Sequence, residues 1–290
     1  MKNLHLISGL PRSGSTLLCQ ILNMNPEFKA TSTSPILDML LSQQSVYSHN
    51  MSFKATDRME TYNNFVDAQK AFLSTFYSDD KVIFDKNRMW PSSLLILDEI
   101  LDNMDTKIIW TYRSPKDIVS SLEARHRQTP VLQYIEDQQT RFSNLLETRI
   151  SGWIGENGIV GLPCRALFDA INMGYEDRIF VVDYKDLCLK PQQTMDEVHK
   201  FLGIQTYKYS QNDFEDLKQT TVEHDLVYNY KYPHDITQGK IEYQEAKISL
   251  PKSMLSSIDQ HFQWVISYCE EQIEKREKQT KTRSLKKVKK

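Results

Sequence analysis

The sequence has little cysteine and no long apolar run. Its four cysteines, at positions 19, 164, 188 and 269, are scattered over 290 residues, and none forms the C-x-x-C pair of zinc or redox sites. No apolar stretch approaches the roughly 18–20 residues that a membrane-spanning helix needs, and the first apolar run is too short for a secretory signal. We therefore predict reduced thiols, no membrane span and a cytoplasmic location.

Acidic residues are absent from the end of the chain. Residues 278–290 hold seven lysines and arginines and no acid, whereas the formal charge of the whole chain is −2, which leaves the preceding residues near −9. An acidic body argues against a nucleic-acid-binding surface spread over the fold, so no nucleic-acid partner is expected. Length and composition predict a single domain over residues 1–277 and a basic, disordered tail over residues 278–290.

A glycine-rich loop near the N-terminus is flanked by a strand and a helix. Residues 4–8 form an apolar run typical of a buried parallel strand, residues 9–15 are rich in glycine, proline and serine, and residues 16–22 resume with helical spacing. A strand, a tight loop and a helix in this order aim backbone N–H groups and the positive end of a helix dipole at one point. A phosphate group fits such a point.

This loop lacks the lysine of the nucleoside-triphosphate motif G-x-x-x-x-G-K-[ST]. Gly9, Gly14 and Thr16 match the motif, but Ser15 takes the place of the lysine that reaches the β- and γ-phosphates. Arg12 is the only cation in the loop. The loop is therefore predicted to hold a phosphate group without bridging a triphosphate. The alternative is an ordinary strand–turn–helix with a chance pair of glycines.

Three further strand candidates alternate with helical patterns, at residues 81–85, 106–112 and 178–184. This alternation predicts an α/β protein with a three-layer, P-loop-like fold, in which helices flank a central parallel sheet. Ligands of such folds bind at the carboxyl ends of the strands. The glycine-rich loop and three polar segments should therefore meet on one rim, the latter at 85–88, 113–114 and 183–185.

Elsewhere the pattern predicts loops and helices. Residues 23–33, 44–56 and 151–161 are predicted as loops, the second and third as substrate loops. A long amphipathic helix is expected over residues 130–150, and another over residues 250–274. We expect Gly203 to end a helix that begins at Pro191.

A second cationic cluster follows the third predicted strand. Arg113 ends that strand, and on a helix beginning at Pro115 the side chains of Ser121 and Arg125 share a face, because they are four residues apart. Two guanidinium groups and a hydroxyl suit a phosphate monoester. The alternative is an exposed basic helix whose arginines pair with Asp117 and Glu123.

Together these motifs resemble the sulfotransferase family that uses 3′-phosphoadenosine 5′-phosphosulfate (PAPS). The likeness is closest to the tyrosylprotein sulfotransferases and to related bacterial and viral members. Residues 9–16 resemble the family's 5′-phosphosulfate motif, and an arginine, a serine eight residues on and an arginine four beyond match its 3′-phosphate motif at Arg113, Ser121 and Arg125. Residues 179–187, with Pro191 and residues 201–203, resemble the family's late strand and helix. The resemblance spans roughly residues 4–204.

The resemblance implies a sulfuryl donor site for PAPS, with 3′-phosphoadenosine 5′-phosphate (PAP) as the product. Arg12 is the first choice for stabilising charge on the leaving phosphate, and Lys86 resembles the family's lysine near the sulfuryl group. The implied donor-binding residues are Pro11, Arg12, Ser13, Gly14, Ser15, Thr16, Arg113, Ser121, Arg125 and Tyr184. No metal is implied, since there is no γ-phosphate to neutralise. Alternatively, Lys86 is a surface lysine paired with Asp85, and Tyr184 packs at the edge of the core.

The sequence departs from the tyrosylprotein enzymes where they carry a glutamate base. Residues 30–35 read ATSTSP and contain no acid. An acceptor hydroxyl usually needs a proton acceptor nearby, and Asp85, Asp38 and His126 are candidates. The acceptor is a small molecule, a glycan or a peptide, and the missing glutamate argues against a protein tyrosine.

The region over residues 227–241 is predicted to fold over the rim, as it does in the family. Lys231, Gly239 and Lys240 would then close on the donor; alternatively, its tyrosines simply pack. Two other functions stay open: a nucleoside or nucleotide kinase with a degenerate phosphate loop, and a non-catalytic nucleotide or nucleic-acid binder that uses the basic tail. The sequence leaves the oligomeric state open.

Overall fold

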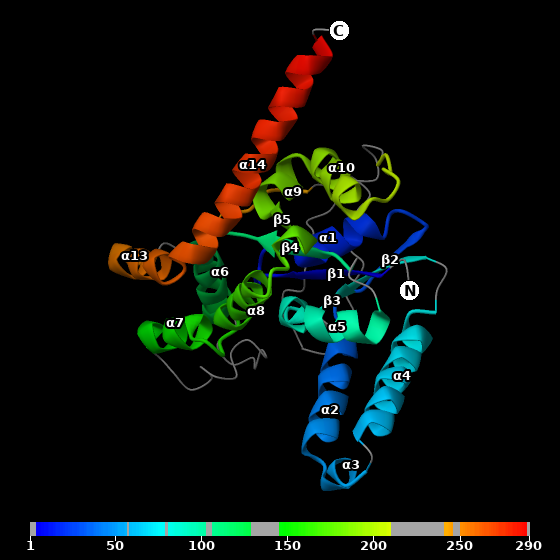
Figure 1. Ribbon diagram of the computed structural model, residues 1–290. Helices are drawn as coiled ribbons and strands as arrows, with labels where there is room; N and C mark the ends of the chain where they lie inside the picture. The colour runs from blue at the N-terminus through cyan, green and yellow to red at the C-terminus, as the bar shows by residue number, and fades with distance from the viewer. Residues whose placement is uncertain are drawn as a thin grey trace.

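Figure 1 shows the protein as a computed structural model. The structure describes residues 4–56, 58–78, 81–102, 106–128, 145–209, 241–245 and 250–288. None of the helices in these ranges combines the length and the apolar composition needed to cross a lipid bilayer.

A parallel sheet forms the centre of the molecule. Its strands run in the order β2-β3-β1-β4-β5, with every neighbouring pair parallel. The bounds are β1 (Leu4–Gly9), β2 (Phe28–Ala30), β3 (Val82–Lys86), β4 (Ile108–Tyr112) and β5 (Ile179–Asp183). All residues of β1 and β4 are buried, as expected for strands covered on both faces. The predicted three-layer α/β fold is confirmed.

Helices cover both faces of the sheet (Figure 1). On one face lie α1 (Ser15–Leu22), α9 (Tyr184–Leu189) and α10 (Pro191–Leu202), which bury apolar side chains against the sheet. The larger core on the other face includes residues of α2 (Ile36–His49), α4 (Arg58–Phe76), η1 (Trp90–Ser93), α5 (Leu94–Leu101), α6 (Pro115–Gln128), α7 (Leu146–Ile154), α8 (Gly161–Asn172), α13 (Lys252–His261) and α14 (Gln263–Val288). The short elements α3 (Met51–Lys54) and η3 (Glu176–Arg178) complete the described set.

Residues 23–33 were predicted as a loop but contain the edge strand β2. The strand is only three residues long, and its exposed Lys29 interrupts the apolar pattern. Asn23 fixes it from the preceding turn, because its side-chain amide donates to the carbonyl of Ala30 at 2.9 Å and accepts from the Ala30 N–H at 2.7 Å. Hydrogen bonds from outside the segment therefore stabilise β2, a strand that the hydrophobic pattern of the sequence does not predict.

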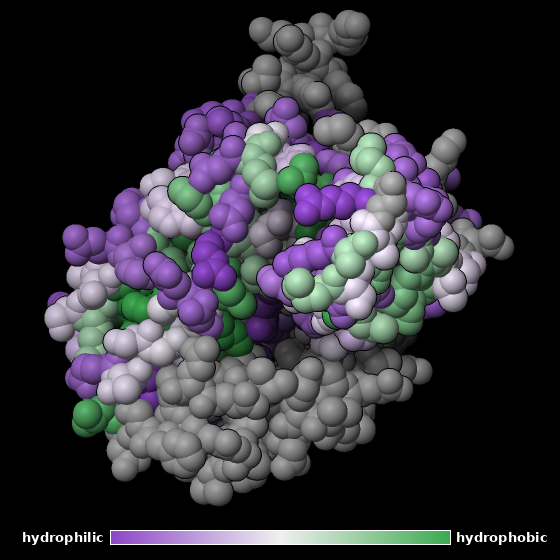
Figure 2. Space-filling model, turned by 60° about the horizontal axis from the view of Figure 1, so that its bottom comes forward, coloured by the Kyte–Doolittle hydropathy of each residue, from purple (hydrophilic) through white to green (hydrophobic). Residues whose placement is uncertain are grey.

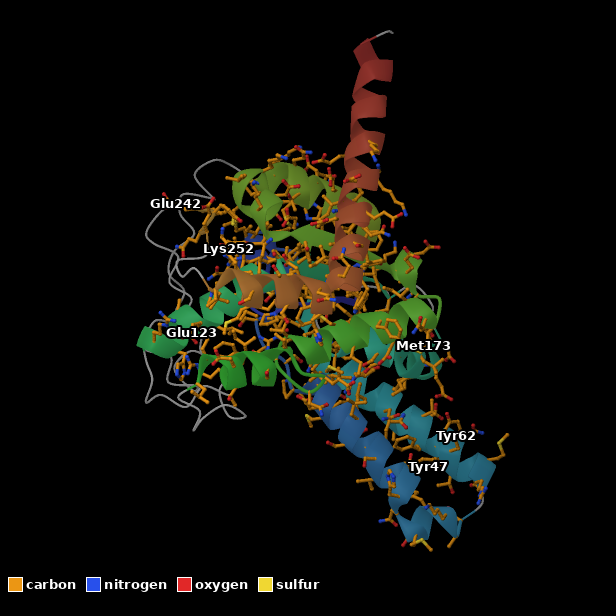
Figure 3. All side chains as sticks on the ribbon, turned by 90° about the vertical axis from the view of Figure 1, so that its left-hand side faces the viewer. Tyr47, Tyr62, Glu123, Met173, Glu242 and Lys252 are labelled. Carbon is orange, nitrogen blue, oxygen red and sulfur yellow. The ribbon has the colours of Figure 1, made fainter. Side chains whose placement is uncertain are left out.

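Residues 44–56 were also predicted as a loop, and this prediction is wrong. Helix α2 continues to His49 and α3 follows, so that α2, α3 and α4 form an arm that extends from the body (Figures 1 and 3). The ring of Tyr47 stacks on that of Phe65 with 4.4 Å between centroids, and it also contacts Phe53 and Tyr62. These contacts across the arm stabilise helix in a polar stretch.

The bounds predicted for the loop over residues 151–161 and for the helix over residues 250–274 are corrected as well. Helix α7 runs to Ile154 and α8 begins at Gly161, so only residues 155–160 of the predicted loop connect helices. The predicted helix over residues 250–274 is two helices, α13 and α14, which meet at the buried Phe262. Of the predicted helix over residues 130–150, residues 130–144 lie outside the described residues.

Helix α14 projects from the body towards the C-terminus (Figure 1). It continues through Val288, so the backbone of residues 278–288, expected to be disordered, is helical. The division into a domain over residues 1–277 and a tail over residues 278–290 stays a prediction. Helix α10 has the predicted bounds, and Gly203 follows it with a φ of 74°.

On the face shown in Figure 2, hydrophobic and hydrophilic residues are mixed in small patches. Exposed apolar side chains on the α2–α4 arm include Val46, Met51 and Met59. They are scattered among polar residues, as is usual for the surface of a folded domain.

Candidate functional site

The glycine-rich loop between β1 and α1 is a tight turn with three left-handed backbone positions. Gly9 has a φ of 130°, Arg12 of 58° and Gly14 of 85°. A Cβ added to Gly9 would collide with the backbone of Thr111, and one added to Gly14 would lie 2.7 Å from Cδ2 of Tyr184. Gly14 also occupies the N-cap of α1, with no side-chain cap. The turn therefore brings the start of α1 against the ends of β4 and β5.

The Ser13 side chain links this turn to strand β4 by hydrogen bonds. Its hydroxyl donates to the carbonyl of Leu10 at 2.5 Å and lies 2.7 Å from the hydroxyl of Thr111, which is fully buried on β4. Since Ser13 gives its proton to Leu10, the Thr111 hydroxyl is the donor between the two, and the carbonyl of Ser8, 3.2 Å from it, shares the same proton. These bonds occupy the Ser13 hydroxyl, which the sequence had suggested as a ligand donor. Thr111 was missed, because a threonine in an apolar strand carries no functional signal of its own.

The two predicted anion motifs meet. Nε of Arg12 lies 3.4 Å from Oγ of Ser121 on α6, a hydrogen bond between residues 109 positions apart. Arg113, at the end of β4, donates from Nη1 to the carbonyl of Arg12 at 3.4 Å. Arg125 lies one turn beyond Ser121 on α6 and is partly exposed. The glycine-rich loop is therefore in contact with Arg113 and Ser121 of the predicted arginine–serine–arginine cluster.

Arg113 is buried within this site and retains an unused donor. Its side chain is 8% exposed, and its Nη2 donates to the carbonyl of Gln244 at 2.8 Å. Its Nε is buried and has no hydrogen-bond partner among the described residues. An unpaired donor on a buried cation is costly unless an anion completes the arrangement. The site therefore fits a negatively charged ligand group.

The ring of Tyr184 lies against Arg113, and a second ring lies against that of Tyr184. Its guanidinium carbon lies 4.8 Å from the ring centroid of Tyr184, whose ring lies 5.5 Å from that of Tyr243. Burial raises the pKa of Tyr184, so its phenol stays neutral. Nζ of Lys185 lies 5.8 Å from the Tyr243 ring. Tyr243 was missed from the sequence. The predicted residues Lys231, Gly239 and Lys240 lie outside the described residues.

Lys86 and Asp85 end β3 and face opposite sides of the sheet, because side chains alternate along a strand. Asp85 is 1% exposed and accepts a 2.8 Å hydrogen bond from Nε1 of Trp90. Burial raises the pKa of Asp85, and hydrogen bonds from Ser34 and Trp90 offset part of the rise. Lys86 lies on the side of α1, and its backbone N–H donates to the hydroxyl of Thr31 at 3.2 Å. The suggested Lys86–Asp85 surface pair is thus disfavoured.

The three candidate bases lie in different surroundings. Asp85 is enclosed among its hydrogen-bond donors, which favours a structural role. Asp38 is exposed in the first turn of α2, and His126 is partly exposed next to Arg125 on α6. The identity of the base stays a prediction. Within the described ranges no group of three or more histidines, cysteines or acids is arranged to hold a metal ion.

The sequence profile of the sulfotransferase domain matches residues 3–281. The chain belongs to the sulfotransferase domain family. This match spans nearly the whole chain and includes both anion motifs, so family membership supports sulfuryl transfer as the activity. No curated protein sequence matches this sulfotransferase at a significant level.

Solved structures share the fold of this sulfotransferase at low sequence identity. The sulfotransferase domain of the curacin biosynthetic pathway is 16% identical, with a TM-score of 0.54 over 90% of this chain and 97% of that one. The sulfotransferase domain of the Synechococcus PCC 7002 olefin synthase is 19% identical, with a TM-score of 0.51 and coverages of 90% and 95%. Mouse sulfotransferase SULT7A1, solved in complex with PAP, is 12% identical, with a TM-score of 0.50 and coverages of 90% and 84%.

Proposed function

We propose that this sulfotransferase moves a sulfuryl group from PAPS to a hydroxyl or amine acceptor. The observation that carries the proposal is the contact of Arg12 with Ser121 and of Arg113 with Arg12, which joins two anion motifs into one site. A donor with two separated anionic groups needs two cationic sites at a fixed spacing. A PAP complex of the structurally similar SULT7A1 supports this choice of donor.

In this proposal the loop and α6 hold the two ends of the nucleotide. Backbone N–H groups of residues 12–16, together with the Ser15 and Thr16 hydroxyls, receive the 5′ end at the start of α1, and Pro11 borders it through its ring. Arg113, Ser121 and Arg125 receive the 3′-phosphate, and the unused Nε of Arg113 is one donor for it. Tyr184, stacked on Arg113, borders the same site.

The chemistry assigned to the chain is electrostatic. The bond from sulfur to the bridging oxygen of the donor breaks, and a bond from the acceptor oxygen or nitrogen to sulfur forms. The acceptor gives its proton to a base, for which Asp38 and His126 are the more accessible of the predicted candidates. Negative charge develops on the leaving phosphate, where the Arg12 guanidinium stabilises it from a fixed position. Lys86, at the end of β3, is assigned to the oxygens of the moving sulfuryl group. Holding the donor and the acceptor in a fixed relative orientation lowers the barrier further.

Calorimetric titration with PAP tests the donor site. We expect metal-independent binding that is at least about tenfold tighter than that of AMP, because AMP lacks the 3′-phosphate that three side chains receive. Binding of ATP with magnesium, and none of PAP, would overturn the proposal and favour the kinase. Transfer of labelled sulfate from PAPS into fractions of a host extract then identifies the acceptor as a small molecule, a glycan or a peptide.

A further inference from the structure

A buried ion pair joins helix α6, which carries Ser121 and Arg125, to helix α7. The carboxylate of Glu123 is on α6 and is fully buried, and Arg149 on α7 is 6% exposed. Nη2 of Arg149 lies 2.8 and 2.9 Å from the two carboxylate oxygens, and its Nε lies 3.0 Å from Oε2. Such a two-point contact between planar groups fixes both distance and orientation.

The position of Glu123 on the helix gives this pair its significance. Glu123 is two residues from Ser121 and two from Arg125, and a two-residue step turns an α-helix by about 200°. Glu123 therefore faces away from the side that Ser121 and Arg125 share. Figure 3 shows Glu123 on α6, with α7 alongside. Arg149 thus contacts α6 on the side opposite the proposed 3′-phosphate site.

Apolar contacts alone would hold α6 less specifically. Ile118, Val119 and Leu122 of α6 are buried in the larger core. Hydrophobic contacts are non-directional, so they set the rotation of a helix less sharply than a two-point contact between planar charged groups does. A buried ion pair adds little net stability over an apolar pair of similar size, but it selects one orientation of the groups that carry it.

We propose that Glu123 and Arg149 are positioning residues that set the rotation of α6 and thereby the recognition of the donor's 3′-phosphate. This inference rests on the proposed function. It makes the ion pair responsible for discrimination between PAP and AMP, and not for binding of the nucleotide's 5′ end. Glu123 and Arg149 act through Ser121 and Arg125 and do not touch the donor.

The test replaces the pair by apolar residues of similar size, in the double variant Glu123→Leu/Arg149→Met. We expect a melting temperature within about 5 °C of the wild type, because an apolar pair replaces a buried ion pair at little cost. PAP binding should weaken at least about tenfold through imprecise phosphate contacts, whereas AMP binding should change less than about twofold. Calorimetry with both nucleotides measures the ratio.

Arg127→Ala is the matched control. Nε of Arg127 lies 2.7 Å from the same Glu123 carboxylate, but its side chain is 55% exposed. We expect no change in the PAP-to-AMP ratio for this variant, because Arg127 is half-exposed and solvent screens its charge, while the two-point contact with Arg149 is kept. If the double variant fails to fold, Arg149→Lys takes its place, since lysine keeps the charge and loses the two-point contact.

An unchanged ratio in a folded double variant or in Arg149→Lys overturns the inference, and so does an equal loss of PAP and AMP binding. A lower ratio with AMP binding retained supports it. The wild type is measured before any variant. If it does not bind PAP more tightly than AMP, the proposed function fails.

Discussion

Arg12 has a left-handed backbone, with a φ of 58°, although it is not a glycine. This conformation costs an L-residue on the order of 1 kcal/mol, so the loop sacrifices stability to place a guanidinium beside Ser121. Strain of this kind is concentrated at functional sites. At the residue scale, the position that the site requires for the Arg12 guanidinium thus conflicts with the backbone conformation that an arginine prefers.

Substitution of Arg12 separates these two effects. We expect Arg12→Gly to be as stable as the wild type or up to about 1 kcal/mol more stable, since glycine adopts positive φ freely. Both Arg12→Gly and Arg12→Ala should lose at least about 100-fold in labelled-sulfate transfer, as is usual when a preorganised donor is removed. Urea unfolding and transfer assays measure the two effects. Transfer retained in Arg12→Gly would show that the Arg12 guanidinium does not stabilise the leaving phosphate.

His5 gives the fold a pH dependence. It is buried on β1, and burial followed by repulsion from Lys107 lowers its pKa from 6.5 to about 4. The folded state thus keeps His5 neutral while the unfolded chain binds a proton below pH 6.5, so its contribution is complete above pH 6.5 and is lost as pH falls towards 4. The loss should approach about 3 kcal/mol.

His5→Phe tests this contribution. Phenylalanine keeps a ring beside Phe84, which His5 contacts at 5.6 Å between centroids. We expect the difference in unfolding free energy between pH 7 and pH 4.5 to be smaller in the variant than in the wild type. Urea unfolding at both values measures it. His199 and Asp85 titrate in both proteins, so their effects cancel in the comparison. Equal pH dependence would exclude His5 as a source.

At the element scale, the phosphate loop depends on neighbours far along the chain. Gly14 is the N-cap of α1, and Tyr184, which begins α9, leaves no room for a Cβ on it. Thr111 of β4 underlies Gly9 in the same way. The loop therefore has its shape only when the carboxyl ends of β1, β4 and β5 lie side by side in the sheet.

Gly14→Ala and Gly203→Ala form a matched pair for this dependence. Both glycines have positive φ, at 85° and 74°, but a Cβ at Gly14 lies 2.7 Å from Tyr184, whereas one at Gly203 meets no atom within 4 Å. We expect each variant to lose about 1 kcal/mol of stability from backbone strain. PAP affinity should fall only in Gly14→Ala, which displaces Tyr184. Calorimetry and thermal melts measure both. A similar loss of affinity in Gly203→Ala would contradict this explanation.

At the scale of the whole molecule, α14 closes the fold before it projects from it. Val265 and Cys269 are buried in the larger core, and the Arg276 guanidinium lies 4.1 Å from the ring centroid of Phe180 on the edge strand β5. Beyond this point the helix extends away from the sheet (Figure 1). The first half of α14 is thus part of the domain.

Truncation tests the division of the chain. A protein ending at Glu277 keeps Val265, Cys269 and Arg276, and we expect its melting temperature and PAP affinity to match those of the full chain. A protein ending at Phe262 should not fold, because the larger core loses the apolar residues of α14. Circular dichroism and PAP titration compare them. Lost PAP binding in a folded protein ending at Glu277 would assign the tail to the donor site.

The sequence predicted the parts of this protein that local pattern encodes. Apolar runs gave the four longer strands, helical spacing gave most helices, and two motifs with fixed internal spacing identified the residues around Arg12 and Ser121. It did not give β2, or the helical residues 44–49 and 51–54 that extend α2 and form α3 in the arm. There, side-chain contacts between distant residues, such as Asn23 with Ala30 and Tyr47 with Phe65, decide the structure.

By itself, the sequence determined the alternation of strands and helices, the glycine-rich loop, and the residue types of the proposed two-anion site. Only the tertiary structure decided that Arg12 and Ser121 touch and that Asp85 is enclosed. It also decided that Arg113 is buried with an Nε that has no hydrogen-bond partner among the residues described. The physical reason is that spacing along a chain fixes neighbours within one helix or strand. Contacts between elements depend instead on how the sheet packs, which no short stretch of sequence specifies.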